Sequence, residues 1–377
     1  MKTLPALACV TLAATLAACG GAPRPVAPPL FPVATIWRAS LDDVIEGALA
    51  TDGRRIFVAG REGTVVALDR GSGGQAWRGA AGRGAITYGS GLLVVRGTDG
   101  TVTALDPATG RQRWRTESGV AGSLPAAVAG DSVLVAGEGL ASLDAGSGRL
   151  AWSVATAAKV SAVPVAAGAR LLIGDESGTL RCRDAASGGE VWAFAAPGLV
   201  VAAPVVDERR RVFVGTLDRS FLALDLDDGR ADWRWRTGAD VRVPAALLGD
   251  KVLFASHEDV LYALRRGNGH LAWRAPLPSR PLAGPLVVAD AVLVACHENE
   301  VVGIDGRTGT RLGSLRAPDE IATPPVVVDG MMFLGLRDRS VVALRLGADT
   351  PSAPAPAPAS DRAPQPAQPQ PPRPPQP

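Results

Sequence analysis

A unit of about 40 residues is repeated along most of the chain. In its clearest copy, the small residue Ala104 is followed by Asp106 two positions later, Gly110 six positions later and Trp114 ten positions later. A unit of this length has too little core to fold alone and must stack on its neighbours. The repeat therefore decides the fold class before any site is considered. The small-residue position recurs at 67, 104, 142, 182, 223, 263, 303 and 343.

Each unit has the pattern of four short strands. A proline opens the first strand, where it interrupts no ladder, and apolar runs such as Ser132–Ala136 indicate a buried second strand. The third strand carries the Asp, whose carboxylate can accept hydrogen bonds from amides of the following turn. The Gly allows a positive φ and leaves room for an indole ring, so the Trp of the fourth strand is expected to hold each unit to the next. These structural Trp residues are Trp37, Trp77, Trp114, Trp152, Trp192, Trp233 and Trp273.

The two ends of the repeat region complete one another. The unit at Ala343 stops before its fourth strand, and the region begins with an unpaired strand that carries Trp37. Pairing them closes a ring and removes an exposed edge. We therefore predict an all-β fold over residues 33–347: an eight-bladed β-propeller of four-stranded antiparallel blades, closed by its N-terminal strand. A seven-bladed ring would require discarding the unit at Gly303, which has Gly313 in place of Trp.

Residues 1–18 have the pattern of a lipoprotein signal peptide. A positive start and a short apolar run lead to Leu16-Ala17-Ala18-Cys19, which matches a lipobox. We expect cleavage before Cys19 and lipidation of that residue, and several acyl chains on one residue give stable anchoring. An ordinary secretory signal with a chance Cys is the alternative. Gly20, not Asp, follows the Cys, which favours the periplasmic face of the outer membrane by the enterobacterial sorting rule.

Proline-rich segments flank the predicted propeller. Residues 19–32 are expected to form a lipidated tether, because proline at this density disfavours a sheet and favours extended conformations. Residues 348–377 show no apolar periodicity and are expected to form a disordered, proline-rich tail. A segment that binds a partner or the cell wall is the alternative interpretation of the tail.

Composition and motifs give little indication of catalysis. The net charge of +2, without a basic cluster interleaved with aromatic residues, gives no reason to expect nucleic acid. No Ser/His/Asp arrangement, phosphate loop, CxxC pair or Rossmann fingerprint occurs. His257 and His297 follow the second strands of adjacent units, but no third ligand accompanies them, so we expect no metal site. Cys182 fills a small-residue position and is expected in the core.

A further set of candidates consists of acidic residues seven positions before the third-strand Asp or its Arg replacement. They fall in the turns between second and third strands, which share one end of a propeller. There they could form an acidic rim that attracts a basic partner or a cation. Acidic residues are also common turn formers, and we favour that explanation. The residues are Glu62, Asp99, Asp218, Glu258, Glu298 and Asp338.

The spacing Ala-x-Asp-x-x-[Thr/Ser]-Gly-x-x-x-Trp resembles the PQQ-type propeller repeat with its tryptophan-docking motif. Good copies begin at Ala104 and Cys182, and the resemblance covers residues 34–346. One branch of this family, the quinoprotein dehydrogenases, implies a quinone cofactor, a calcium site and a vicinal Cys-Cys disulfide. This chain has no Cys-Cys pair, so we do not transfer that activity.

The other branch is the BamB family of lipoproteins, which shares the lipobox, the short tether and eight blades. That resemblance implies a non-enzymatic scaffold of the outer-membrane β-barrel assembly machinery, which docks on the periplasmic domains of the barrel-forming subunit. It also implies no cofactor, no catalytic residue and no small-molecule substrate. A PQQ-dependent enzyme, or a propeller that binds a periplasmic polymer or protein without an assembly role, are the alternatives.

Overall fold

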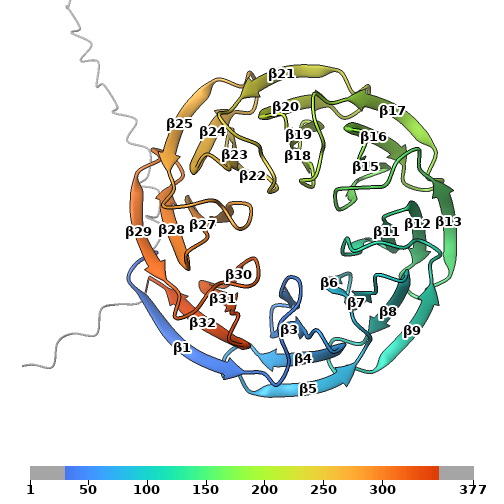
Figure 1. The fold of residues 1–377 in the computed structure, drawn as a ribbon, viewed down its shortest axis with the longest axis vertical. Helices are drawn as coiled ribbons and strands as arrows, with labels where there is room; N and C mark the ends of the chain where they lie inside the picture. Colours follow the sequence, from blue (N-terminus) through green and yellow to red (C-terminus); the bar gives the residue numbers. More distant parts are fainter. Residues whose placement is uncertain (1–29, 348–377) are drawn as a thin grey trace, which may run out of the picture.

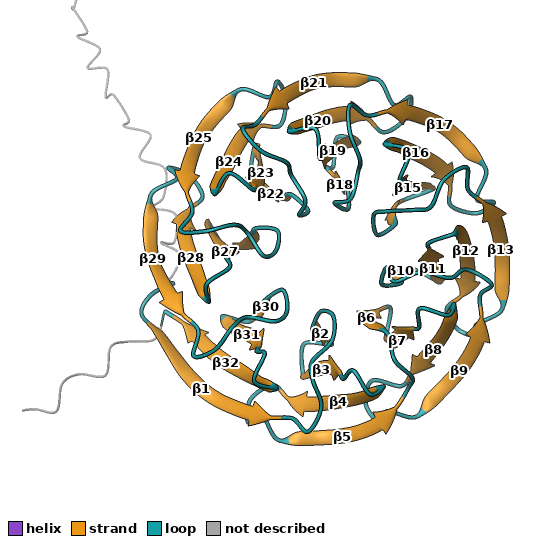
Figure 2. Cartoon of the chain, in the orientation of Figure 1, coloured by secondary structure: helices purple, strands orange, loops and turns teal. Residues whose placement is uncertain are grey.

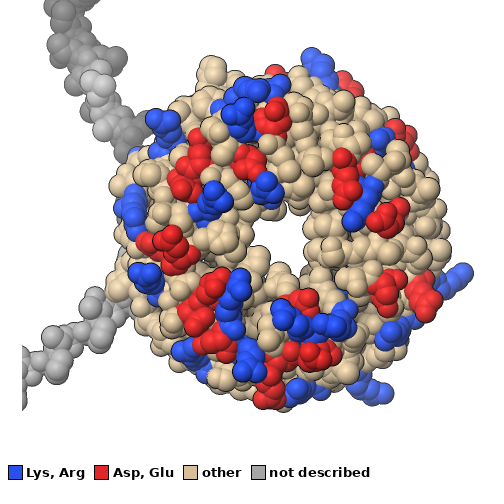
Figure 3. Space-filling model, viewed as in Figure 1, with Lys and Arg blue, Asp and Glu red and all other residues tan. Residues whose placement is uncertain are grey.

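The computed structural model describes residues 30–347, in which all regular elements are β-strands. They form eight four-stranded antiparallel sheets arranged in a ring (Figure 1), and the space-filling view shows an opening at its centre (Figure 3). The prediction of an eight-bladed β-propeller is therefore confirmed. The predicted signal peptide, Cys19, most of the tether and the proline-rich tail lie outside the described residues. Within residues 30–347, no helix has the length and apolar character needed to span a bilayer.

The blades are numbered along the chain, and each is given from its innermost to its outermost strand. Blade 1 contains β2 (Ala50–Thr51), β3 (Arg55–Ala59), β4 (Thr64–Asp69) and β5 (Gln75–Ala80); blade 2 contains β6 (Ala85–Gly89), β7 (Leu92–Arg96), β8 (Thr101–Leu105) and β9 (Gln112–Glu117). Blade 3 contains β10 (Ala127–Ala129), β11 (Ser132–Ala136), β12 (Gly139–Asp144) and β13 (Leu150–Ala155); blade 4 contains β14 (Val165–Ala167), β15 (Arg170–Gly174), β16 (Thr179–Asp184) and β17 (Glu190–Ala195).

The second half of the ring repeats this order. Blade 5 contains β18 (Val205–Val206), β19 (Arg211–Gly215), β20 (Ser220–Asp225) and β21 (Ala231–Arg236); blade 6 contains β22 (Ala246–Leu248), β23 (Lys251–Ser256), β24 (Val260–Arg265) and β25 (Leu271–Pro276). Blade 7 contains β26 (Leu286–Val288), β27 (Ala291–Ala295), β28 (Glu300–Asp305) and β29 (Arg311–Arg316); blade 8 contains β30 (Val326–Val328), β31 (Met331–Gly335), β32 (Ser340–Leu346) and β1 (Val33–Ser40).

The ring closes by pairing the first described strand with the last. β1 pairs antiparallel with β32, and Trp37 lies opposite Ala343 (Figure 1). Because β26–β29 form a complete blade, the seven-bladed alternative, which discards the unit at Gly303, is wrong.

Burial changes with strand position from the channel to the rim. Second strands such as β7, Leu92–Arg96, are buried along their whole length, as the apolar runs in the sequence predict. Outer strands such as β13 alternate between exposed and half-buried residues and form the rim of the ring (Figure 2). The hydrophobic core consists of clusters that span neighbouring blades; one of them joins Trp37 and Phe333 of blade 8 to Ile56 and Leu68 of blade 1. Each blade therefore depends on its neighbours for burial.

Candidate functional site

The seven tryptophans of the repeat connect each blade to the next. Each lies directly across the ladder from the small third-strand residue, as Trp114 lies opposite Ala104, and a register shift follows at Leu105. Each indole Nε1–H donates to a backbone carbonyl oxygen in the turn between the third and fourth strands of the next blade. The acceptors, in order from Trp37 to Trp273, belong to Arg70, Pro107, Ala145, Ala185, Leu226, Arg266 and Gly306, at 2.8–3.1 Å.

The glycine of the repeat is required at this contact. Gly110 has a φ of 71°, and a Cβ there would lie 2.5 Å from Cε3 of Trp77. Any larger residue would therefore be strained in its backbone and would push the indole away. The same contact occurs between Trp37 of blade 8 and Gly73 of blade 1, so the ring closure uses the same device as the internal junctions.

The aspartate of the repeat organises the turn that receives the indole. The carboxylate of Asp106 accepts hydrogen bonds from the backbone amides of Ala108 and Thr109, each at 3.0 Å, and from the Thr109 hydroxyl at 3.1 Å. In the equivalent turns the hydroxyls of Ser147 and Ser187 hold the pKa of Asp144 and Asp184 below the usual range. These bonds stabilise the charged carboxylate.

Blade 7 departs from this pattern. Gly313 lies opposite Gly303, so no tryptophan is present at this position. The ring of Phe31, a residue that the sequence assigns to the tether, lies against both glycines. Leu30 is also packed against the propeller and is only 6% exposed. The sequence offers one signal for this contact, the paired glycines, but does not indicate what covers them.

The six candidate acidic residues lie at one end of the ring, distributed over six blades. Asp218 pairs with Arg234 of its own blade at 3.0 Å, and Asp338 pairs with Arg38. Glu258 accepts from the Tyr262 hydroxyl at 2.7 Å. Acidic and basic side chains are interspersed on the face shown in Figure 3. Asp99 accepts from the Thr101 amide, and Glu62 and Glu298 are exposed.

The histidines and cysteines are not gathered into a site. Nδ1 of His257 lies 3.6 Å from a carboxylate oxygen of Asp240, and burial lowers the pKa of this histidine. Residues 30–347 contain no group of three or more His, Cys, Asp or Glu that could hold a metal ion. Cys182 and Cys296 are buried free thiols in different blades, and burial raises the pKa of the two thiols to about 11 and about 12.

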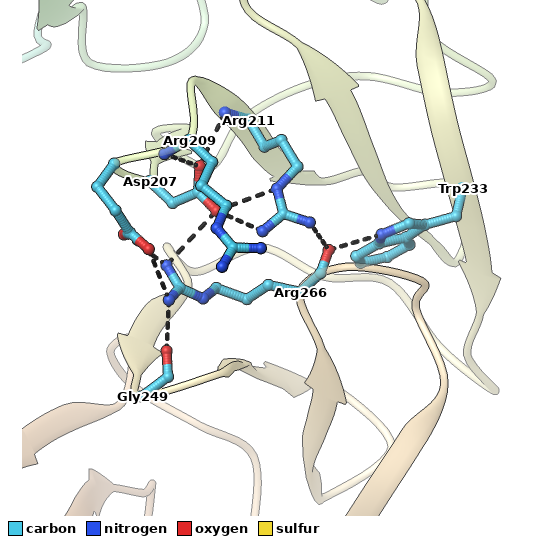
Figure 4. Close-up of polar contacts among 7 residues, drawn as sticks. Asp207, Arg209, Arg211, Trp233, Gly249 and Arg266 are labelled. Atoms are coloured by element: carbon cyan, nitrogen blue, oxygen red, sulfur yellow. Dashed lines mark hydrogen bonds and ion pairs between the residues drawn. The ribbon is translucent and has the colours of Figure 1, made fainter.

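A charged cluster between blades 5 and 6 was not anticipated from the sequence. The carboxylate of Asp207 is fully buried and accepts from the Arg209 and Arg211 amides and from the Arg211 guanidinium (Figure 4). Arg266 of blade 6 reaches back to Glu208 through two hydrogen bonds of 2.7 and 2.9 Å. Its carbonyl oxygen accepts from both Arg211, at 2.7 Å, and the indole of Trp233, at 3.0 Å.

The cluster is possible because one turn is longer than its equivalents. Residues 207–210 connect β18 to β19, whereas residues 130–131 make this connection in blade 3. The longer turn also forms one wall of an open groove of about 490 Å³, and β14 with the following Gly168 forms the other. Val165, Val206 and Leu226 supply apolar lining. A second cleft, of about 140 Å³, lies between blades 8 and 1 and is lined by Asp43, Thr64 and Arg78, among others.

A buried arginine connects blade 2 to the loop that leads into blade 3. Arg96 is the last residue of β7, the position that Ala136 occupies in β11 of blade 3. Its side chain is buried, and the residue is only 2% exposed. Its guanidinium donates to the carbonyl oxygens of Val120, Gly122 and Leu124 at 2.6–3.0 Å. Burial lowers the pKa of this arginine. The side chain therefore holds the loop in place.

These observations define the class of protein as an eight-bladed propeller whose blades are joined by docked tryptophans. A family model described as outer membrane protein assembly factor BamB matches residues 34–141 and 136–349. The chain therefore belongs to this family of PQQ-type repeat propellers, which confirms the resemblance inferred from the repeat.

Individual relatives are distant. The outer membrane protein assembly factor BamB of Shewanella oneidensis is 22% identical over 262 residues, which cover 55% of this chain and 66% of that protein. The match thus spans slightly less than two thirds of the relative. The crystal structure of BamB from Moraxella catarrhalis has a TM-score of 0.71 at 20% identity, covering 83% of this chain and 100% of that one. Quinohemoprotein alcohol dehydrogenase from Comamonas testosteroni has a TM-score of 0.69 at 13% identity, covering 85% and 77%.

The likeness to the quinohemoprotein raises the question of a quinone–calcium site. Among the described residues, no three carboxylate, imidazole or thiol groups come together where they could hold a metal ion. The two described cysteines also lie in separate blades, so they are not a vicinal pair. At these identities the structural likeness shows the fold alone.

Proposed function

We propose that this chain is a non-enzymatic, lipid-anchored scaffold in the assembly of outer-membrane β-barrel proteins. The observation that carries the proposal is the match of the BamB family model to residues 34–141 and 136–349, nearly the whole propeller. The lipobox that ends at Cys19 adds a reason to place the protein at the periplasmic face of the outer membrane. The partner would be a barrel-assembly subunit with periplasmic domains.

The test is genetic and biochemical and uses the full chain. Deleting the gene should lower the amount of β-barrel proteins in the outer membrane, and in-cell crosslinking of a tagged chain should capture the barrel-forming subunit. A Cys19→Ala variant should fold but leave the membrane fraction. Unchanged barrel-protein levels together with no captured assembly subunit would reject the assembly role.

The same material tests the alternative of a quinoprotein enzyme. Purified chain mixed with PQQ and calcium should show no bound quinone absorbance after gel filtration. Stoichiometric quinone binding would instead favour the enzyme, whatever the outcome of the capture experiment.

A further inference from the structure

The junction between blades 7 and 8 needs a docking aromatic that blade 7 does not contain. At the seven other junctions, an indole lies opposite a small third-strand residue and binds the turn of the next blade. At this junction the cross-strand pair is Gly303 and Gly313. Two opposed glycines provide no side chain, and an unfilled hollow at a blade junction is destabilising.

Phe31 fills this position from outside the blade. A Cβ at Gly313 would lie 2.8 Å from Cγ of Phe31, and one at Gly303 would clash with Cε2 of the same ring. The ring therefore lies against both glycine backbones, as the indoles lie against the turn glycines elsewhere. Leu30 belongs to the hydrophobic cluster between blades 7 and 8, together with Leu293 and Leu344, and Phe31 packs against it.

The same segment also replaces a missing turn. In the other blades, a covalent turn joins the third strand to the fourth, but in blade 8 these two strands are β32 and β1, which lie at opposite ends of the described chain. The amide of Gly347 donates to the carbonyl oxygen of Leu30 at 3.0 Å, next to the first pair of the ladder, Val33 and Leu346. The N-terminal segment thus lies where the turn of blade 8 would lie.

We propose that residues Leu30–Pro32 are a latch, in which Phe31 is the docking aromatic of blade 7 and the blade-7 glycines are its binding recess. The recess is occupied by the N-terminal segment of the same chain. Ring closure is therefore made by three contacts together: the β1–β32 ladder, Trp37 on blade 1 and Phe31 on blade 7.

The latch also determines where preceding chain leaves the propeller, at the outer edge of blades 7 and 8. The length of the tether to the membrane follows from this exit point and rests on the lipidation of Cys19 that the proposed function includes. Only residues 19–29 then remain as a tether, and 11 extended residues reach at most about 40 Å. The latch itself is independent of the lipid, so it is tested by folding measurements, and its failure would not affect the assembly role.

The decisive experiment moves the aromatic from the latch into the blade. In the full chain, Phe31→Ala should lower Tm by about 5 °C, by loss of a packed aromatic ring. It should also speed amide hydrogen exchange at Gly347, whose acceptor belongs to the latch. Adding Gly313→Trp to Phe31→Ala should recover most of the loss, because the indole restores the repeat pattern. Gly313→Trp alone should not stabilise the protein, since Phe31 occupies the recess.

Ile36→Ala provides the matched control, because Ile36 lies on β1 but its side chain is exposed. It should lower Tm by less than Phe31→Ala does and leave exchange at Gly347 unchanged. Phe31→Leu should give an intermediate Tm and provides a folded variant if Phe31→Ala does not fold. The proposal is overturned if Phe31→Ala and Phe31→Leu both behave like wild type, or if Gly313→Trp gives the Phe31→Ala chain no recovery.

Discussion

At the scale of single residues, the blade junctions join a polar contact to an apolar one. The ring of Trp114 packs against the backbone of Gly148 while its Nε1–H reaches the Ala145 carbonyl, so no polar atom of the indole is left unpaired on burial. Asp144 organises the same turn through the Ser147 amide and hydroxyl. The junctions whose receiving turn contains this Asp therefore depend on a charged carboxylate, whereas Arg265 takes its place in the turn of blade 6.

This dependence predicts acid sensitivity. The pKa of Asp69, Asp106, Asp144, Asp184 and Asp305 is lowered in the folded protein, so their contribution to stability is complete above the unfolded-state pKa of about 3.9 and is lost as pH falls through the lower folded-state values. We expect Tm to be level near neutral pH and to fall below about pH 4.

The measurement is Tm by circular dichroism from pH 7 to pH 2. The double variant Asp144→Asn, Asp184→Asn keeps amide oxygens as acceptors but cannot titrate, and should show a shallower acid decline. An equally steep decline in the variant would show that other groups are responsible.

Asp207 is the residue at which the charged cluster between blades 5 and 6 can be disrupted. Asp207→Ala removes a fully buried carboxylate and leaves the Arg211 guanidinium without its ion pair, so we expect a loss of about 3 kcal/mol in unfolding free energy. Urea unfolding at pH 7 measures it. The matched control is Asp131→Ala, at the exposed turn of blade 3, which should change stability by less than about 0.5 kcal/mol. Equal effects of the two variants would show that the cluster does not stabilise the junction.

At the scale of elements, the β1 strand has the same role as the internal outer strands. Trp37→Ala should cost about 3 kcal/mol, as much as Trp77→Ala, because both remove an indole that packs on a glycine and binds a carbonyl of the next blade. Thermal or urea unfolding of the two variants measures this. An unchanged Tm for Trp37→Ala would contradict the closure.

At the scale of the whole molecule, the two ends of the described residues, Leu30 and Gly347, lie at one point of a closed ring. Because Leu30 and Gly347 are hydrogen-bonded, a short linker between them should convert the split blade into an ordinary one. A circular permutant with new ends in the exposed turn at residues 130–131 should fold to the same circular dichroism spectrum with a Tm close to that of the parent. The control is a parent chain that carries the same linker sequence as a tail. If this control folds and the permutant does not, the N-terminal strand has to be free to close the ring.

The sequence by itself determined the number of blades, their strand order and the role of the repeated Asp, Gly and Trp, because all these depend on contacts within one unit or between adjacent ones. It also indicated the closure, because the last unit lacks a fourth strand and the repeat region begins with an unpaired one. In a closed ring these two strands can only pair with each other. The tertiary structure decided what the repeat does not specify. Arg266 reaches Glu208 across 58 positions, Arg96 binds the next loop, and Phe31 covers glycines more than 270 residues away along the chain. Such contacts depend on which side chains the folded ring brings together, and local pattern carries no record of that proximity.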